Sequence, residues 1–418
     1  MKNLGIIMVS GLLLMSPSVF AQDNVDQGNL TIDAQIRARG EFDNGVKNPR
    51  GEGTDAAAFI NQRARLSMTY DRQGLIVKIT GQETGVWGQD DIKNQKDAHF
   101  GLHEAWAKLD KDGWFLQIGR QTLVYDDERL LGGLDWHVAG NHHDAIKGGY
   151  EDAHNKVHLI ITKNSDAEND RINYFTGNMP YKSMQTLWYH YSGNNSPFQA
   201  SLLFINLGRE AGDNTEGATK YMQTFGTYLT YKAGAFNANV SLYAQTGKTT
   251  DDQSVGAWMG SLNLGYAVAP TVTLNAGIDM LSGTKESDSK YKSFNPLYGT
   301  HHKFYGAMDY FYASTFMTRG LQDINLGINW KATKKTNWTL TWHNFATAVE
   351  VPNHNKGLGN EFDLQFNYKV AKDITLMGGA SMMFGTETMD AIKGGDHSKG
   401  QSWGWVALNI TPRLFTTK

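Results

Sequence analysis

Apolar and polar residues alternate along many segments of the chain. In residues 323–330, for example, one face carries Ile324, Leu326, Ile328 and Trp330, and the other carries Asp323, Asn325, Gly327 and Asn329. The same alternation recurs in 271–280 and 361–368. A period of two places every second side chain on the same face of an extended chain, so these segments are predicted to be β-strands with one apolar face.

Eighteen segments are predicted as strands, most of them close to the roughly 9–11 residues that a tilted membrane-spanning strand needs. They are 29–41, 58–71, 74–86, 101–110, 113–121, 142–151, 154–163, 183–192, 197–207, 221–232, 235–245, 256–268, 271–282, 322–331, 336–346, 360–369, 373–384 and 402–412.

The connections between these segments alternate in length. Short turns such as 71–74 and 110–113 are followed by long loops such as 122–141 and 283–321. Short periplasmic turns and long extracellular loops are the rule in outer-membrane barrels. A soluble β-sandwich would share the alternation of side chains but has no reason to separate its loops by length. The predicted fold is therefore all-β: a single closed antiparallel transmembrane β-barrel of about eighteen strands, covering 22–418.

The first residues predict export. Lys2 precedes a short apolar run, and Val19 and Ala21 stand at the −3 and −1 positions of a small-residue cleavage site. This pattern is typical of a secretory signal peptide and is too short for a spanning helix, so residues 1–21 are set apart from the fold. Together with the predicted barrel, it indicates the cell outer membrane.

Composition agrees with this interpretation and excludes several others. No later stretch approaches the ~20 consecutive apolar residues of a membrane helix. Glycine is abundant, with 45 residues, and the chain contains no cysteine, which excludes disulfides and thiolate metal sites. The formal net charge of −3 does not favour a nucleic-acid partner.

Alternation assigns some charged residues to the lumen. On the first two strands Arg37, Arg39, Arg63 and Arg65 fall opposite the apolar face. An arginine on the lipid face costs about 2–4 kcal/mol at the membrane midplane, so these four are predicted to line the pore. Such a positive stripe would bind carboxylate or phosphate groups and favour anionic solutes.

Other residues leave more than one interpretation open. Glu361 and Asp363 also point inward by alternation, so the arginines and the acids could instead neutralise one another along the wall. Arg120 falls on the apolar face with Ile118, which requires either a bulge after Gly119 or a strand that has already left the membrane.

The longest loop, 283–321, is rich in aromatic residues and contains Lys303 and Asp309. A segment of this kind is predicted to fold into or over the lumen, where stacked rings suit sugars, although it could also pack against other outer loops. The pairs His142–His143 and His301–His302 could be drawn into a metal or catalytic site, but this is not favoured. Neighbouring residues on a strand face opposite sides, so His142 and His143 could not both bind one ion from inside. No cofactor, metal or enzymatic activity is expected.

Three sets of motifs resemble the alginate export family. They are Ile118-Gly119-Arg120-Gln121 with Asp127-Glu128-Arg129-Leu130-Leu131-Gly132, Leu134-Asp135-Trp136 and His143-Asp144-Ala145; His302-Lys303-Phe304-Tyr305-Gly306-Ala307-Met308-Asp309-Tyr310; and Gly359-Asn360-Glu361-Phe362-Asp363-Leu364 with Tyr368-Lys369.

The resemblance spans essentially the whole mature chain and implies an eighteen-stranded outer-membrane barrel with an electropositive constriction and an inward loop. It extends pore-lining roles to Arg63, Arg65, Arg120 and Arg129, whereas those of Arg37 and Arg39 rest on alternation alone.

The expected function is a channel that moves an anionic polysaccharide, oligosaccharide or similar acidic solute. Its expected partners are outer-membrane lipid, an anionic saccharide solute and the barrel-assembly machinery, and the chain is expected to be a monomer. Two alternatives remain: a barrel enzyme acting at the outer surface, and a structural or adhesion barrel with a blocked lumen.

Overall fold

A computed structural model describes residues 28–89, 99–168, 171–312 and 318–417 of the chain. Almost all regular structure in these residues is antiparallel strand. The elements are β1 (Asn29–Asn44), β2 (Ala57–Arg72), β3 (Leu75–Val86), β4 (Phe100–Lys111), β5 (Trp114–Gln121), β6 (His143–Glu151), β7 (Asn155–Lys163), β8 (Ser183–Ser192), β9 (Phe198–Glu210), β10 (Thr219–Ala233), β11 (Phe236–Lys248), β12 (Ser254–Ala269), β13 (Val272–Leu281), η1 (His301–Lys303), β14 (Leu321–Trp330), β15 (Thr336–Ala346), β16 (Gly357–Ala371), β17 (Ile374–Gly385), α1 (Glu387–Lys393), β18 (Gln401–Ile410) and β19 (Arg413–Thr416).

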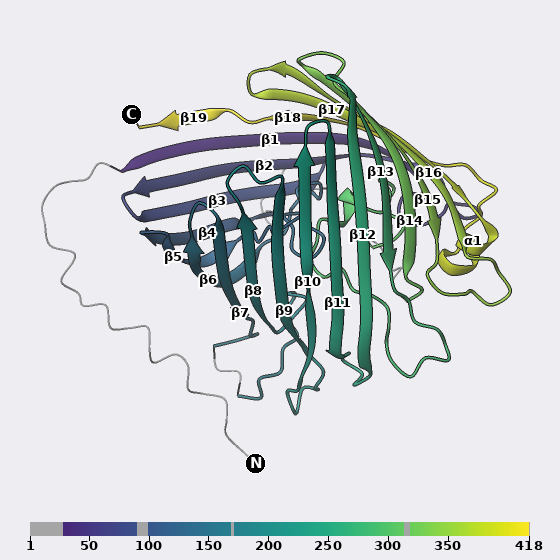
Figure 1. The fold of residues 1–418 in the computed structure, drawn as a ribbon, viewed down its shortest axis with the longest axis horizontal. Coiled ribbons are helices and arrows are strands. Elements are labelled where there is room, and N and C mark those ends of the chain that lie inside the picture. The colour runs from purple at the N-terminus through teal and green to yellow at the C-terminus, as the bar shows by residue number, and fades with distance from the viewer. Residues whose placement is uncertain (1–27, 90–98, 169–170, 313–317, 418) are drawn as a thin grey trace, which may run out of the picture.

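The sheet closes into a barrel. Each strand pairs with its neighbours in sequence, and β1 pairs with β18, so no edge is left open (Figure 1). β19 continues β18 along the same side of β1, after an interruption at Thr411 and Pro412. Proline has no backbone N–H and cannot extend the ladder, which accounts for the break. β18 and β19 together occupy the position of one strand in the barrel. The predicted closed antiparallel barrel of eighteen strands is therefore confirmed.

The predicted strand boundaries agree with the structure to within three residues at each end. The short elements η1, α1 and β19 were not predicted. The proposed signal peptide, 1–21, lies outside the described residues. No helix among the described residues is long and apolar enough to span a membrane.

Exposure follows the predicted alternation. On β1, Ile36 is 53% exposed on the outer face, whereas Arg37 next to it is 7% exposed toward the interior. On β2, Leu66 is 49% exposed and Arg63 is fully buried. The outer face is therefore apolar, as lipid contact requires, and Arg37 and Arg63 lie inside.

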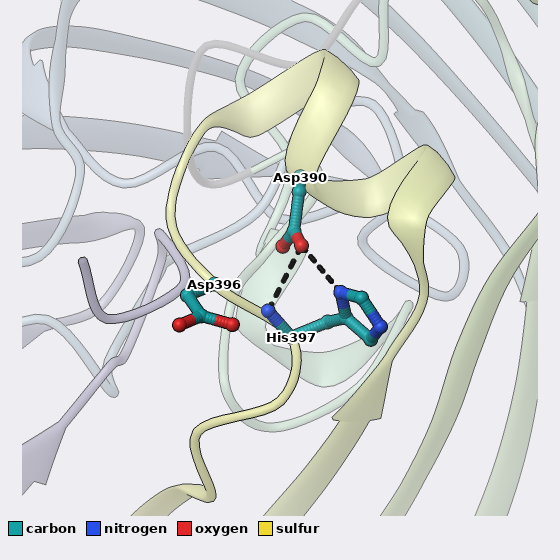
Figure 2. A group of neighbouring side chains, drawn as sticks. All are labelled: Asp390, Asp396 and His397. Carbon is teal, nitrogen blue, oxygen red and sulfur yellow. Dashed lines mark hydrogen bonds and ion pairs between the residues drawn. The ribbon is translucent and has the colours of Figure 1, made fainter. Parts of the chain in front are cut away.

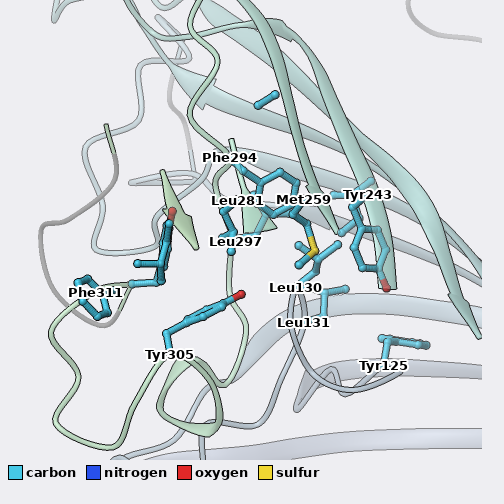
Figure 3. Close-up of a cluster of buried hydrophobic side chains, with 14 of the residues drawn as sticks. Tyr125, Leu130, Leu131, Tyr243, Met259, Leu281, Phe294, Leu297, Tyr305 and Phe311 are labelled. Atoms are coloured by element: carbon cyan, nitrogen blue, oxygen red, sulfur yellow. The ribbon is translucent and has the colours of Figure 1, made fainter. Parts of the chain in front are cut away.

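Two loops fold into the barrel. Inward loop A comprises residues 122–142 between β5 and β6, and inward loop B comprises the described residues of 282–320 between β13 and β14. They pair with each other through Leu131 and Tyr298. Figure 3 shows the apolar side chains that anchor both loops against the wall of β11 to β13. The expectation that the aromatic loop enters the lumen is confirmed, whereas the inward course of loop A was not foreseen.

Candidate functional site

Four arginines form a ladder on the inner wall of β1 and β2. Arg37 lies directly opposite Arg63 in the strand register, Arg39 lies opposite Asn61, and Arg65 lies opposite Gln35. They therefore follow one another along the barrel wall. Arg39 stands nearest the long loops and Arg65 nearest the short turn between β2 and β3.

The backbone of inward loop A covers this ladder. Nη1 of Arg37 donates to the carbonyl of Asp135 at 2.7 Å, and Nη1 of Arg39 donates to the carbonyl of Trp136 at 2.7 Å. Nη2 of Arg65 donates to the carbonyl of Ala139 at 2.9 Å. Carbonyl acceptors satisfy guanidinium donors without cancelling their charge, so the loop is held while the wall stays positive.

Asp135 is the main counter-charge of the ladder. Its carboxylate lies 2.7 Å from Arg63, 3.4 Å from Arg37 and 3.6 Å from Arg65. Desolvation inside the barrel would raise the pKa of Asp135, but attraction to Arg63 and Arg37 outweighs it and lowers the pKa below its usual value.

The ladder keeps an excess of positive charge. Arg39 pairs with Glu41 at 2.9 Å. Four guanidinium groups thus meet two carboxylates in ion pairs, which leaves a net charge of +2 among the described groups.

A cavity of about 490 Å³ opens beside the outer part of the ladder. Its cations are Arg37, Arg39 and Lys303. Hydroxyl and amide groups line other parts of it, and they belong to Thr339, Thr341, Gln365 and Asn367. Asp135 and Asp363 also line it, so the cavity combines three cations and two acids with neutral hydrogen-bonding groups.

Aromatic rings form another part of this cavity. Trp136 stacks on His302 with 4.2 Å between ring centroids, and the guanidinium carbon of Arg39 lies 3.8 Å from the Trp136 ring centroid. Trp405 meets Trp136 edge-on at 4.7 Å. Sequence reasoning did not single out Trp136 or Trp405 for the site, although Trp136 belongs to one of the motifs quoted above.

A second cavity of about 310 Å³ lies at the other end of the ladder. Its charged lining consists of Arg65, Arg413, Lys78, Asp33 and Glu104. Arg37 and Arg39 face the first cavity and Arg65 faces the second, so the ladder links the two along the wall.

Arg129 lies inside the protein rather than along the open lumen. Its guanidinium contacts Asp127 at 2.8 Å and Asp279 at 2.7 Å, and Nη1 donates to the hydroxyl of Tyr305 at 3.1 Å. It is 2% exposed and joins inward loop A to inward loop B and to β13.

Arg120 is on the outside of the barrel, which corrects the pore-lining role that the resemblance suggested. Arg120 lies opposite Asp144 in the register of β5 and β6, and its Nε and Nη2 donate to the two carboxylate oxygens at 2.9 and 3.0 Å. The neighbouring outward residues Ile118 and Ile146 are about half exposed. Without a bulge to turn it inward, Arg120 stays on the apolar face, and Asp144 balances its charge.

The remaining site residues lie on or under inward loop B. Lys303 lies 3.4 Å from Glu128, and Asp309 lies 3.0 Å from His302. Glu361 and Asp363 point inward from β16, but they are 0% and 5% exposed because loop B covers them.

Two of the histidines considered in the sequence have local structural partners. His143 is buried, with Nδ1 bonded to the hydroxyl of Tyr181 at 2.7 Å, and the ring of His302 is stacked on Trp136.

One trio of potential metal ligands occurs among the described residues: Asp390, Asp396 and His397, in the loop that contains α1 (Figure 2). Nδ1 of His397 already lies 2.5 Å from Asp390, and Asp396 accepts hydrogen bonds from the backbone and hydroxyl of Ser398. These contacts close a local turn and account for the arrangement without a metal.

Comparisons with known proteins agree on the architecture. The family model described as alginate export matches residues 17–399. The fold is similar to Pseudomonas aeruginosa OccK9 (OpdG), with a TM-score of 0.65 and 13% identity over 92% of this chain and 98% of that chain. It is also similar to P. aeruginosa OpdK solved with vanillate, with a TM-score of 0.63 and 10% identity over 92% and 99% of the two chains. For P. aeruginosa OpdL the TM-score is 0.64 and the identity 12%, over 92% and 99%. A search of curated proteins finds no match.

Proposed function

Because the chain belongs to the alginate export family and forms an outer-membrane β-barrel, we propose that it is a channel for small anionic saccharides or related ring-bearing acids. The observation that carries the proposal is the arginine ladder, whose net charge of +2 runs along the inner wall from one cavity to the next. A fixed positive wall lowers the free energy of an anion that has lost part of its hydration shell.

The backbone contacts of the ladder suit passage rather than tight binding. Arg37, Arg39 and Arg65 each donate a hydrogen bond to a carbonyl group of inward loop A. A solute carboxylate or phosphate is a stronger acceptor than a carbonyl and can take over such donors one after another. Each exchange replaces one set of hydrogen bonds with another, so an anion meets a sequence of shallow sites.

The first cavity indicates a ring-bearing solute. Trp136 and Trp405 line the cavity with aromatic surface near Arg37 and Arg39. Thr341 and Gln365 supply neutral hydrogen-bonding groups to the same cavity. A carboxylate attached to a sugar or an aromatic ring matches this combination of groups. Vanillate, in the OpdK structure, is a ring-bearing acid of this kind.

The size of the cavity favours small solutes over a bulky polymer. Inward loops A and B occupy much of the interior and leave cavities of about 490 and 310 Å³ at the ladder. An oligosaccharide or a single substituted ring fits spaces of this order.

Planar-bilayer recordings test the proposal. A salt gradient across the membrane should give a reversal potential that shows anion preference, and oligomers of uronic acids should block the current more strongly than neutral oligosaccharides of equal length. Cation preference, or equal block by charged and neutral sugars, would contradict it.

A plugged barrel is a second candidate, because inward loops A and B share one continuous apolar cluster inside the barrel. The same recordings separate the two candidates. A correctly folded barrel that passes no measurable current would favour the plugged structural role.

A further inference from the structure

The turn at the tip of inward loop B rests on two acidic side chains of β16. Oε1 of Glu361 accepts the backbone N–H of Met308 at 2.8 Å, and Oδ2 of Asp363 accepts the backbone N–H of Ala307 at 3.2 Å. Glu361 and Asp363 are two positions apart on the strand, so their side chains project from the same face. Consecutive amides of the loop therefore meet consecutive inward carboxyl groups of the wall.

This turn needs outside support. Tyr305 and Asp309 have φ angles of 64° and 57°, in the left-handed region that residues other than glycine rarely adopt. Gly306 between them has φ 85° and approaches Glu361 so closely that a Cβ would lie 2.7 Å from Oε2. Conformations of this kind persist where surrounding contacts hold them, and the two carboxyl groups supply such contacts.

The two carboxyl groups are also neighbours of each other and lack a full set of partners. They accept the amides of two successive loop residues, which places the two carboxyl groups side by side. Oε2 of Glu361 and Oδ1 of Asp363 are buried and have no hydrogen-bond partner in the described part of the chain. Glu361 forms no salt bridge with any described residue, and it is completely buried.

The charges around this pair do not supply the missing cation. The titratable groups that face it, directly or through a shared partner, are Asp43 of β1, Asp279 of β13, Asp323 of β14, His343 of β15, His302, Asp309 and Tyr310 of inward loop B, and Lys393 of α1. Arg37, Arg39 and Lys303 line the first cavity together with Asp363, but their ion pairs are with Asp135, Glu41 and Glu128. His343 lies 3.0 Å from Asp323 and 3.6 Å from Asp363, so its ring is already shared by two acids. Two ionised carboxylates in contact would repel each other strongly here.

We propose that Glu361 and Asp363 are positioning residues that share one proton and thereby fix the turn of inward loop B beside the first cavity. The shared proton gives the two carboxyl groups a hydrogen bond in place of repulsion, and it leaves Oε1 and Oδ2 free to accept the amides of Met308 and Ala307. Loss of that proton places two negative charges side by side, pushes the groups apart and releases the turn. The shared proton is independent of which solute passes through the barrel. It rests on the proposed channel function only in the experiment that measures current.

Hydrogen–deuterium exchange of the peptide that contains Ala307 and Met308 tests the proposal in the full-length, folded barrel. After correction for the intrinsic pH dependence of exchange, the wild type should be protected at neutral pH and should lose protection by about tenfold at alkaline pH, as expected for a lost hydrogen bond to a charged group. Glu361→Gln should stay protected throughout, because a carboxamide accepts from Met308 and donates to Asp363 without a titratable proton. Glu361→Ala should exchange about tenfold faster at every pH.

Two further variants complete the design. Asp363→Asn should give the same flat pH profile of exchange as Glu361→Gln. It provides an independent test if Glu361→Ala does not fold. Asp252→Asn, which removes an exposed loop carboxylate paired with Lys220, should leave the wild-type profile unchanged. The proposal is overturned if Glu361→Gln and Asp363→Asn keep the wild-type pH dependence, or if Glu361→Ala leaves protection intact.

Conductance gives a second readout. The wild type should show a larger and noisier current at alkaline pH, and Glu361→Gln should not. A barrel that passes no current at any pH would contradict the proposed channel function and leave the exchange test decisive for the shared proton.

Discussion

Arg37 of β1 and Arg63 of β2 lie opposite each other in the strand register, and both contact the carboxylate of Asp135 in inward loop A. Opposed arginines repel, so their closeness requires an acceptor between them. Asp135 meets that requirement and at the same time fixes loop A against the wall. One acidic side chain therefore sets both the charge of the ladder and the position of the loop that narrows it.

Replacing Asp135 by Asn should raise anion selectivity. The charge of the ladder and its two paired acids changes from +2 to +3, because four guanidinium groups then meet only Glu41. Arg63 also loses its charged partner, which weakens the hold on loop A by about 1–3 kcal/mol and should make the open current noisier. Reversal potentials and current noise measure the two effects. Asp252→Asn serves as the control, and an unchanged or lowered anion preference in Asp135→Asn would refute the role of Asp135.

Arg39→Gln and Arg120→Gln should differ in selectivity although each removes one guanidinium. Arg39 lines the first cavity and lies over the ring of Trp136, so its loss should lower anion selectivity and weaken block by ring-bearing acids. Arg120 lies on the outer face and should leave both properties unchanged. Reversal potentials and block by a uronic-acid dimer provide the comparison, and equal effects of the two substitutions would show that the assignment of faces is wrong.

Much of the fold could be predicted because it depends on local alternation. The strict period of two in β14, with Ile324 and Leu326 outside, follows from the contrast between lipid and the barrel interior, which acts on every residue independently. α1 was missed because its seven residues lie in a long loop without any apolar periodicity that extends beyond them. β19 was missed because Pro412 interrupts the last strand.

The site was less predictable because it depends on contacts between distant residues. Alternation placed Arg37 and Arg63 on the inner wall, but nothing local indicates that Asp135, about a hundred positions after Arg37, folds back onto them. Glu361 was expected in the lumen for the same reason as the arginines, yet inward loop B covers it. Arg120 shows the opposite case, because alternation placed it outward and the resemblance to a family motif suggested otherwise.

Anion selectivity should stay constant as the pH falls to about 4, the usual pKa of an aspartate. It should rise only below that pH, when Asp135 takes up a proton and loses its negative charge. The arginines lower the pKa of Asp135, so its ion pairs stabilise the folded state above the unfolded pKa and are lost only as the pH falls through the lower, folded value. Reversal potentials measured down a pH series check this. Asp135→Asn should show no such acid step, and a wild-type step at mildly acidic pH would contradict the prediction.

Arg120→Ala should destabilise the barrel although it leaves the pore unchanged. Asp144 would remain on the outer face without the two hydrogen bonds that balance its charge, at a cost of up to about 1 kcal/mol near the membrane boundary. The double variant Arg120→Ala with Asp144→Ala should recover part of that loss, because both charges are gone. Heat-induced unfolding in detergent, followed by gel mobility, measures the series, and a double variant less stable than Arg120→Ala would argue against a balanced outward pair.

Gly306→Ala should displace the turn of inward loop B for two separable reasons. The φ angle of 85° disfavours any residue with a Cβ, and that Cβ would meet the Glu361 carboxyl group at 2.7–2.8 Å. Together these effects should cost about 1–3 kcal/mol, increase exchange of the Met308 amide and raise the current.

Adding Glu361→Ala to Gly306→Ala removes the steric conflict but leaves the backbone strain. The exchange rates of the four proteins in this cycle give the free energy of opening of the turn. The change in this free energy in the double variant should be smaller than the sum of the changes in the two single variants. Simple additivity would mean that Gly306 is required only for its backbone conformation, and that the close approach to Glu361 does not position the loop.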